Sequence, residues 1–325
     1  LEVTGALEWS GAWQRGELHS GDLVISDLSV VDTAQERFAL TGMNTRLQPG
    51  RYEAVSRLSW RGLLLGRVNL GPGEALLDSE PGRFALLEPL ELSVLGGNLK
   101  LNALSYTLPY AREEERDHAF LSASLRGLEM QPLTRALGWP EFGGTISGDL
   151  PGASLSQGVF SLQGGIRLDV FGGKVEVSEM QIERPFGVLP SLSANVGMHG
   201  LDLDLLTETF SFGHIGGRVD GHVVGLRVLD WEPVAFDAWL GTPKGTGKAG
   251  KISRKAVNHL ASIGGGGAAA ALANPLLKVF SQFSYRRIGL GCRLENYVCE
   301  VSGVKDDGDG VLLMEGAGLP KITIR

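Results

Sequence analysis

Residues 166–177 read Ile-Arg-Leu-Asp-Val-Phe-Gly-Gly-Lys-Val-Glu-Val. Apolar and polar side chains alternate on both sides of the glycine pair. Because neighbouring side chains of a strand point to opposite faces of a sheet, this pattern is typical of two strands that bury one face. Residues 99–103 alternate in the same way, and Gly pairs, Asn or Asp separate similar short runs over most of residues 1–240. The sequence therefore predicts a mainly β protein.

The sequence also contains an internal repeat. Residues 127–152 align without a gap on residues 200–225 (200 − 127 = 73), and the Gly-Gly strand quoted above matches residues 95–101 (171 − 95 = 76). Repeated units of this length stack and bury one continuous apolar surface. We therefore predict an elongated, curved stack of antiparallel β repeats that forms an apolar groove, with repeat units at about 95–152 and 171–225. An ordinary β-sandwich with a chance repeat is the alternative.

The apolar positions of the quoted stretch are the candidates for the lining of this groove. Burial of acyl chains against such a face contributes about 0.8 kcal/mol per methylene group. A structural or binding module, with the same side chains in a closed core, is the alternative. The candidate groove residues are Ile166, Leu168, Val170, Val175 and Val177.

The composition changes after the repeats, which predicts three regions. Residues 1–245 form the repeated groove region, residues 246–283 a linker and helical cap, and residues 284–325 the C-terminal strands. The cap contains a predicted helix over 253–262 with Ser at its N-cap, and a second over about 268–283. No run of about 18 apolar residues predicts a membrane span.

The two cysteines lie in the C-terminal strands. Cys292 and Cys299 fall in β-like runs over 286–294 and 297–304, which break at Glu295-Asn296. A tight turn there brings the two sulfurs within reach of a disulfide. A disulfide indicates an oxidising compartment, and a pair of reduced core cysteines is the alternative. Two thiols without further ligands do not predict a zinc site.

Motifs for catalysis, cofactors or nucleic acid are weak or absent. The net charge of −7 argues against binding to duplex nucleic acid. Gly245 to Lys251 resembles a phosphate loop, but Ile252 stands where the P-loop has Ser or Thr. The histidines show no metal-ligand spacing, and there is no G-x-S-x-G motif. We predict no catalytic, metal or cofactor residues, although the sequence leaves open a hydrolase with distant carboxylates.

Several C-terminal motifs together resemble the C-terminal region of the YdbH-like family, which comprises AsmA-like proteins of Gram-negative envelopes. The resemblance covers most of residues 120–325 and includes the Gly-Gly repeats. Its motifs are Trp-Glu-Pro-Val-Ala-Phe-Asp (231–237), Lys-Ile-Ser-Arg-Lys-Ala-Val (251–257), Ser-Ile-Gly-Gly-Gly-Gly (262–267), Phe-Ser-Tyr-Arg-Arg-Ile-Gly-Leu (283–290), Cys-Arg-Leu (292–294) and Val-Cys (298–299).

The resemblance implies a periplasmic protein with an inner-membrane anchor outside this sequence, which begins at Leu1 and contains no signal peptide. It implies a bridge that conducts phospholipids between the inner and outer membranes and supports outer-membrane homeostasis. It also implies a small outer-membrane lipoprotein as partner, bound by strand addition. Since strand addition needs an open sheet edge, we expect Ile322, Thr323 and Ile324 to supply it. A non-transporting envelope scaffold remains the alternative.

Overall fold

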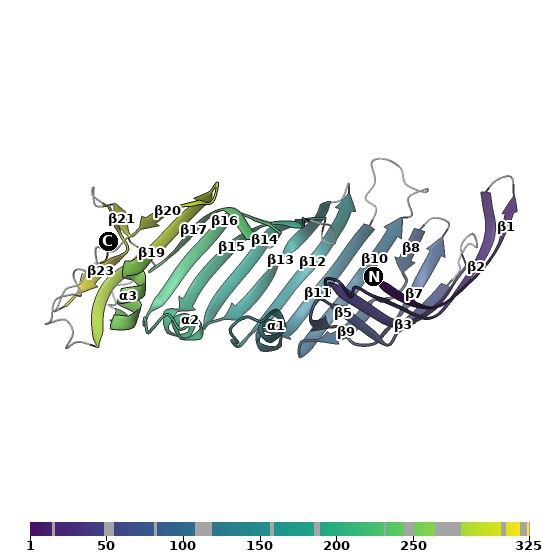
Figure 1. Cartoon of the computed structure of the whole chain (residues 1–325), viewed down its shortest axis with the longest axis horizontal. Helices are drawn as coiled ribbons and strands as arrows, with labels where there is room; N and C mark the ends of the chain where they lie inside the picture. The colour runs from purple at the N-terminus through teal and green to yellow at the C-terminus, as the bar shows by residue number, and fades with distance from the viewer. Residues whose placement is uncertain are drawn as a thin grey trace. The chain divides into compact units, whose positions relative to one another are not determined.

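The protein is known from a computed structural model. The residues that it describes are 1–14, 17–48, 55–80, 83–107, 119–156, 159–184, 189–230, 232–243, 250–263, 281–306, 310–318 and 324. The prediction of a mainly β protein is confirmed, because most described residues lie in strands of one large, open antiparallel sheet. Three short helices accompany the strands among these residues (Figure 1).

The elements follow one another in chain order. The strands are β1 (Glu2–Gln14), β2 (Glu17–Val31), β3 (Phe38–Leu47), β4 (Val55–Trp60), β5 (Gly62–Leu65), β6 (Val68–Asn69), β7 (Gly73–Glu80), β8 (Arg83–Leu86), β9 (Leu90–Val94), β10 (Gly97–Thr107), β11 (Ala119–Glu129), β12 (Gly144–Ser156), β13 (Val159–Val170), β14 (Gly173–Glu183), β15 (Ser191–Asp202), β16 (Arg218–Leu229), β17 (Glu232–Gly241), β18 (Gly250–Ser253), β19 (Gln282–Glu295), β20 (Val298–Gly303), β21 (Lys305–Asp306), β22 (Val311–Leu312) and β23 (Met314–Ala317). The helices are α1 (Met130–Leu137), α2 (Leu203–Thr209) and α3 (Arg254–Ile263).

The chain divides into two compact units. Unit 1 comprises residues 1–139, 145–166 and 181–190, and unit 2 comprises residues 140–144, 167–180 and 191–325. Within unit 2, strand β17 of the predicted groove region pairs directly with strand β19, which belongs to the predicted C-terminal region except for its first two residues. The packing of these strands therefore joins parts of the chain that the composition separates.

Unit 1 consists of long antiparallel pairs around a small core. Strand β1 pairs with β2, and β10 pairs with both β9 and β11. Trp60, Ala75 and Leu92 are buried together. The indole of Trp60 lies over Gly73, where an added Cβ would touch the ring, and its Nε1–H donates to the carbonyl of Gly71 at 3.1 Å. Glycine at position 73 therefore lets the large ring pack flat on the strand.

The helices α1 and α2 occupy matching places in the two repeated segments. Each follows a strand that ends one residue after a Gly-Leu pair, and the two glycines, Gly127 and Gly200, have φ of 62° and 61°. Thr134 and Thr207 are buried in the middle of the two helices. Positive φ strains residues that carry a Cβ, whereas glycine adopts it freely. The glycine of each Gly-Leu pair therefore permits the bend through which the strand enters its helix.

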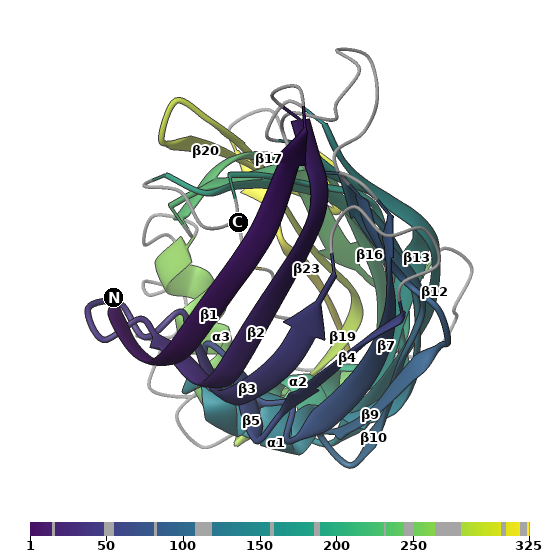
Figure 2. The same ribbon diagram turned by 90° about the vertical axis from the view of Figure 1, so that its right-hand side faces the viewer.

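Helix α3 belongs to the core of unit 2 and begins where the sequence predicts. The hydroxyl of Ser253 accepts a hydrogen bond from the N–H of Ala256 at 3.2 Å, which is N-cap geometry. Ala256, Val257 and Leu260 are buried against Ile252 and other core residues. In Figure 2, α3 and α2 lie on the side toward which the strands of unit 2 curve. The first predicted helix of the cap is confirmed.

The second predicted helix, over about 268–283, lies mostly outside the described residues. Its last two residues are wrongly assigned to it, because Gln282 and Phe283 form the start of β19 and pair with Ser253 and Ile252. Phe283 and Tyr285 are both buried, which is the two-residue period of a strand. Phe283 therefore matches the helical spacing of the preceding apolar residues only by chance, because it belongs to a strand.

A two-residue turn joins β19 to β20. Asn296 and Tyr297 both have positive φ, 50° and 63°, as the central residues of a type I′ turn require. The turn lies one residue later than the predicted break at Glu295-Asn296. Cys292 and Cys299 form a disulfide with a Cα–Cα distance of 5.5 Å, so the predicted pairing is confirmed.

The expected C-terminal edge is described only at Ile324. Its side chain is fully buried, and its N–H and C=O are both hydrogen-bonded to Met314 or Leu313. Ile322 and Thr323 lie outside the described residues. The backbone of Ile324 is thus already engaged within unit 2.

Candidate functional site

One face of the unit 2 sheet carries apolar side chains in rows that cross the strands. Val196 of β15 lies opposite Val223 of β16, which lies opposite Ala238 of β17, which lies opposite Cys292 of β19. Residues directly opposite in paired strands place their side chains on the same face. Four strands therefore contribute one row of apolar side chains to one surface, which we call the apolar face.

Two further rows flank the first at a spacing of two residues along β15, β17 and β19, whereas on β16 a bulge makes the step from Val223 to Leu226 three residues. We define the apolar face by the apolar residues of these rows and of the adjoining strand ends. They are Leu192, Ala194, Val196, Met198, Val223, Leu226, Val228, Phe236, Ala238, Leu240, Leu290, Cys292, Leu294 and Val301.

The opposite face of the same strands differs in chemistry. Arg293 lies opposite Asp237 and forms an ion pair with it, with Nη2 and Oδ2 2.9 Å apart. Hydrogen bonds to Asp237 raise the pKa of Arg293 further above its already high value. Trp239 also lies on this face, opposite His222 and against Gly289 and Gly291. The described side chains of one face of the unit 2 sheet are thus mainly apolar, whereas the other face carries the Arg293–Asp237 ion pair and Trp239.

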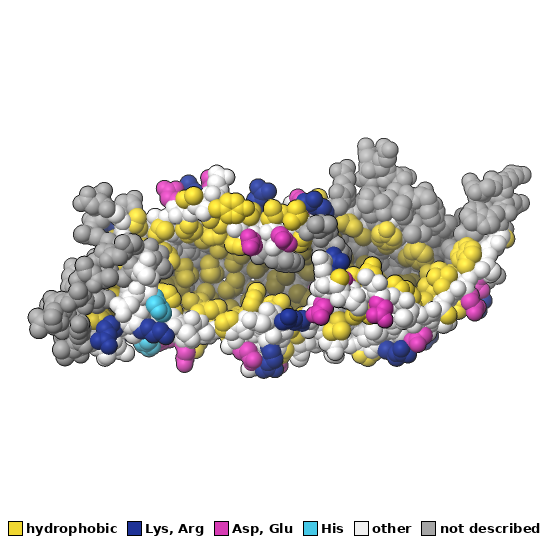
Figure 3. All heavy atoms as spheres, viewed as in Figure 1, with side chains coloured by type: hydrophobic (Ala, Val, Ile, Leu, Met, Phe, Trp, Pro, Cys, Tyr) yellow, Lys and Arg dark blue, Asp and Glu magenta, His cyan; other side chains and the backbone are white. Residues whose placement is uncertain are grey.

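The side chains of the apolar face keep part of their surface exposed. Except for Ala194, every residue that defines the face is half-buried rather than buried. The core cluster beside α3 is different, since Ile252, Val257 and Met314 are 0% exposed. Figure 3 shows apolar side chains gathered in a hollow over the strands of unit 2, with charged side chains at its borders. At the end of the face beside α2 and α3, Met198, Leu240, Leu290 and Val301 pack against the core cluster.

The apolar face ends at a pocket beside α2 and α3. The pocket has a volume of about 310 Å³ and is lined by helix residues on one side and strand residues on the other. Leu240 and Leu290 belong both to the pocket and to the apolar face. The complete lining is Leu203, Leu206, Thr207, Phe210, Phe212, Ile215, Val219, Leu240, Leu260, Ile288 and Leu290.

A larger and more open hollow of about 820 Å³ lies on the other side of α2. Phe171 and Phe142 line it with their rings 4.7 Å apart, and Leu205 and Glu208 of α2 contribute its opposite wall. Asp169 and Lys174 add charge to its lining. This hollow is therefore mixed in character, whereas the pocket on the inner side of α2 is apolar.

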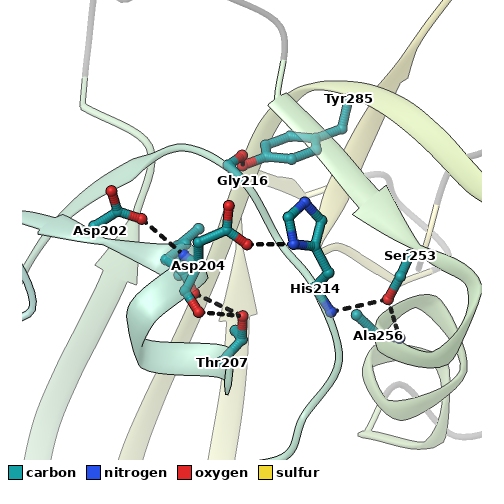
Figure 4. Close-up of polar contacts among 9 residues, drawn as sticks. Asp202, Asp204, Thr207, His214, Gly216, Ser253, Ala256 and Tyr285 are labelled. Atoms are coloured by element: carbon teal, nitrogen blue, oxygen red, sulfur yellow. Dashed lines mark hydrogen bonds and ion pairs between the residues drawn. The ribbon is translucent and has the colours of Figure 1, made fainter. Parts of the chain in front are cut away.

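Polar contacts hold α2, α3 and β19 together beside the apolar pocket (Figure 4). Asp204 Oδ1 lies 2.5 Å from His214 Nδ1, and the N–H of His214 donates to the hydroxyl of Ser253 at 3.0 Å. The hydroxyl of Tyr285 donates to the carbonyl of Gly216 at 2.8 Å. Burial, with a contribution from the charge of Asp204, raises the pKa of Tyr285 to about 12. These groups position the walls of the pocket.

The raised pKa of Tyr285 predicts a loss of stability at alkaline pH. The unfolded chain ionises near the ordinary value of 10.0, so the stability that the neutral phenol provides is complete below pH 10 and is lost as pH rises through about 12. At about 1.4 kcal/mol per pH unit, the loss is on the order of 2 kcal/mol. Urea unfolding at about pH 9 and about pH 12 should show this extra loss in the wild type and not in Tyr285→Phe. Parallel pH profiles would contradict the prediction.

The predicted groove residues occupy alternating positions of β13 and β14. Ile166, Leu168, Val175 and Val177 are half-buried and Val170 is buried, whereas the polar residues between them are exposed. Val175, like Met198, Leu240 and Leu290, packs against the core cluster of unit 2. Val170 lines the larger hollow.

Most residues of the site were not singled out from the sequence. The signal existed in β15, where Leu192, Ala194, Val196 and Met198 occur at every second position. For the pocket there was no such signal, because its walls come from separate elements that only the topology brings together.

Two other features are absent from the described part of the chain. No group of three or more metal-ligating side chains lies together there, and no helix there is long and apolar enough to cross a membrane. The chain matches no family model, no curated protein and no solved structure.

Proposed function

We propose that the apolar face of unit 2 forms a hydrophobic β groove that binds the acyl chains of phospholipids and conducts them along the groove while the headgroups remain in water. The observation that carries this proposal is a row of apolar side chains across four strands that stay half-exposed on one face. A closed core would bury such residues, and contiguous apolar patches that stay exposed on a protein often mark binding sites.

The chemistry of the face fits hydrocarbon chains. The residues that define it carry no charge, and Arg293 and Asp237 point to the opposite face. Burial of methylene groups at about 0.8 kcal/mol each provides affinity without directional contacts. Such a surface lets a chain slide, because contacts between hydrocarbon groups are non-directional. Conduction of this kind requires no covalent step, so we propose no enzymatic activity.

The cellular setting of the proposal comes from the disulfide and from the resemblance. The bond between Cys292 and Cys299 favours an oxidising compartment. The motifs that resemble the YdbH-like family indicate the periplasm of a Gram-negative envelope, with an inner-membrane anchor outside this sequence. In that setting the protein conducts phospholipids between the inner and outer membranes, and a small outer-membrane lipoprotein is the proposed partner.

Native mass spectrometry tests the proposal directly. The chain is purified from a Gram-negative periplasm and its bound lipids are extracted and identified. We expect phospholipid to co-purify at about one or more molecules per chain, because an exposed apolar face is stabilised by any chain that covers it. A spectrum of protein without lipid would favour an envelope scaffold with no lipid path.

A further inference from the structure

The pocket between α2, α3 and β19 differs from the rest of the apolar face because it encloses space. Among its lining residues only Thr207 carries a polar side-chain atom, and its hydroxyl donates to the carbonyl of Leu203 at 2.7 Å. The pocket thus offers no hydrogen-bond partner to water. Closed apolar cavities of about 150 Å³ take up small hydrocarbons, and this pocket, which is open at one side, has about 310 Å³.

The composition of the lining also restricts the kind of occupant. Sites for whole small molecules place a few polar groups that fix the ligand's orientation, and this pocket has none available. It suits the purely apolar end of a molecule whose polar part stays outside. Leu240 and Leu290 continue from the pocket into the rows of the apolar face, so a hydrocarbon chain that lies on the face can enter the pocket without leaving apolar surroundings.

The walls of the pocket are held in place before any ligand arrives. Asp202 caps α2 by accepting from the N–H of Asp204 at 2.9 Å. His259 Nδ1 lies 2.8 Å from the carbonyl oxygen of Phe212, and the two rings meet edge to face with centroids 4.9 Å apart. Phe210, at the end of α2, lines the pocket but is 52% exposed, which places it at the mouth. A preformed pocket avoids the cost of ordering its walls on binding.

We propose that this pocket binds the methyl end of a single acyl chain. It would then be a fixed binding site, which we call the end site, at the end of the apolar face. The proposal rests on the proposed function, since it takes its ligand class from the lipid that the face conducts. It adds a position at which one chain stops, whereas the open rows let chains move. The chemical class of ligand is a long unbranched hydrocarbon chain, free as a fatty acid or attached to a phospholipid.

Photo-crosslinking locates the chain end in the wild-type protein. Palmitic acid with a diazirine at its methyl end is bound to the full chain and irradiated, and the adducts are mapped by mass spectrometry. We expect the adducts to concentrate on Leu206, Phe210 and Leu260. Adducts spread over β15 and β16, with none on these residues, would contradict the end site but would be compatible with lipid binding on the apolar face. Absence of any palmitate binding, together with protein free of phospholipid, would overturn both.

A pair of variants on α2 provides the matched control. Leu206→Trp fills the pocket from its inner side, whereas Leu205→Trp places the same ring on the outer side of the helix, where Leu205 is 47% exposed. We expect the first to weaken palmitate binding at least tenfold and the second to leave it unchanged. Phospholipid co-purification should persist in both, because the rows of the face are untouched. Equal affinities of Leu206→Trp and Leu205→Trp for palmitate would contradict the end site.

Discussion

We expect Val223→Asp to lower phospholipid co-purification at least tenfold and Val224→Asp to leave it at the wild-type level, although the two residues are neighbours in one strand. Val223 lies in the central row of the apolar face, opposite Val196 and Ala238. Val224 points to the other face, where it is 52% exposed. The same chemical change is therefore made once inside the proposed lipid path and once outside it.

The physical reason is the cost of bringing acyl chains against a carboxylate. An ionised group that loses its water without a partner costs several kcal/mol, and the described neighbours of Val223 on this face carry no cation. Asp is too short to extend its charge to the border of the face, as Lys or Arg can. We expect at least a tenfold loss of bound phospholipid in Val223→Asp.

Circular dichroism and thermal unfolding provide the control for folding. Val224→Asp adds a charge opposite Asp237, but that carboxylate is already paired with Arg293, so a small loss of stability is expected. Val223→Asp should also fold, because the residue is half-buried and water reaches it when no lipid is bound. If both folded variants carry as much phospholipid as the wild type, the apolar face is not the lipid path.

Local patterns in the sequence were sufficient to predict much of the fold. The alternation in residues 166–177 corresponds to β13 and β14, and Ser253 caps α3 as predicted. The cysteine spacing led to the correct disulfide. These features depend on neighbours within a few residues, for which the period of the side chains is decisive.

The pocket and the C-terminal packing could not be predicted in this way. Leu206, Leu260 and Leu290 line one cavity although long stretches of chain separate them. Ile324 was expected at a free edge, but it is buried against Met314. Such contacts follow from which strands pair and on which face, and apolar spacing alone also suits a helix, as Phe283 illustrates.

The second large effect is expected at two glycines of the repeated segments. Gly97 and Gly173 start β10 and β14 and have no positive φ, so backbone strain plays no part in their requirement. A Cβ at Gly173 would lie 2.5 Å from the carbonyl oxygen of His199, and a Cβ at Gly97 would lie 2.6 Å from that of Arg126. Both distances are too short for any real Cβ contact, and the obstacle is backbone that cannot rotate away.

We therefore expect Gly97→Ala and Gly173→Ala each to lower the free energy of unfolding by about 2 kcal/mol, the usual cost of forcing an extra group into packed structure. The two positions share no contacting residue, so the double variant should lose on the order of 4 kcal/mol. Gly143→Ala is the matched control, because Gly143 has no positive φ and no atom lies within 4 Å of an added Cβ. Its effect should stay within about 0.5 kcal/mol of the wild type.

Urea unfolding followed by circular dichroism measures these differences. Equal losses at Gly97 and Gly173 support the proposal that the two sequence repeats are also structural repeats, in which a strand starts against the backbone of the Gly-bend before α1 or α2. A loss at only one glycine would mean that the two segments pack differently despite their shared sequence. A loss as large at Gly143 would show that any side chain in these turns is harmful and that the close backbone approach is not the cause.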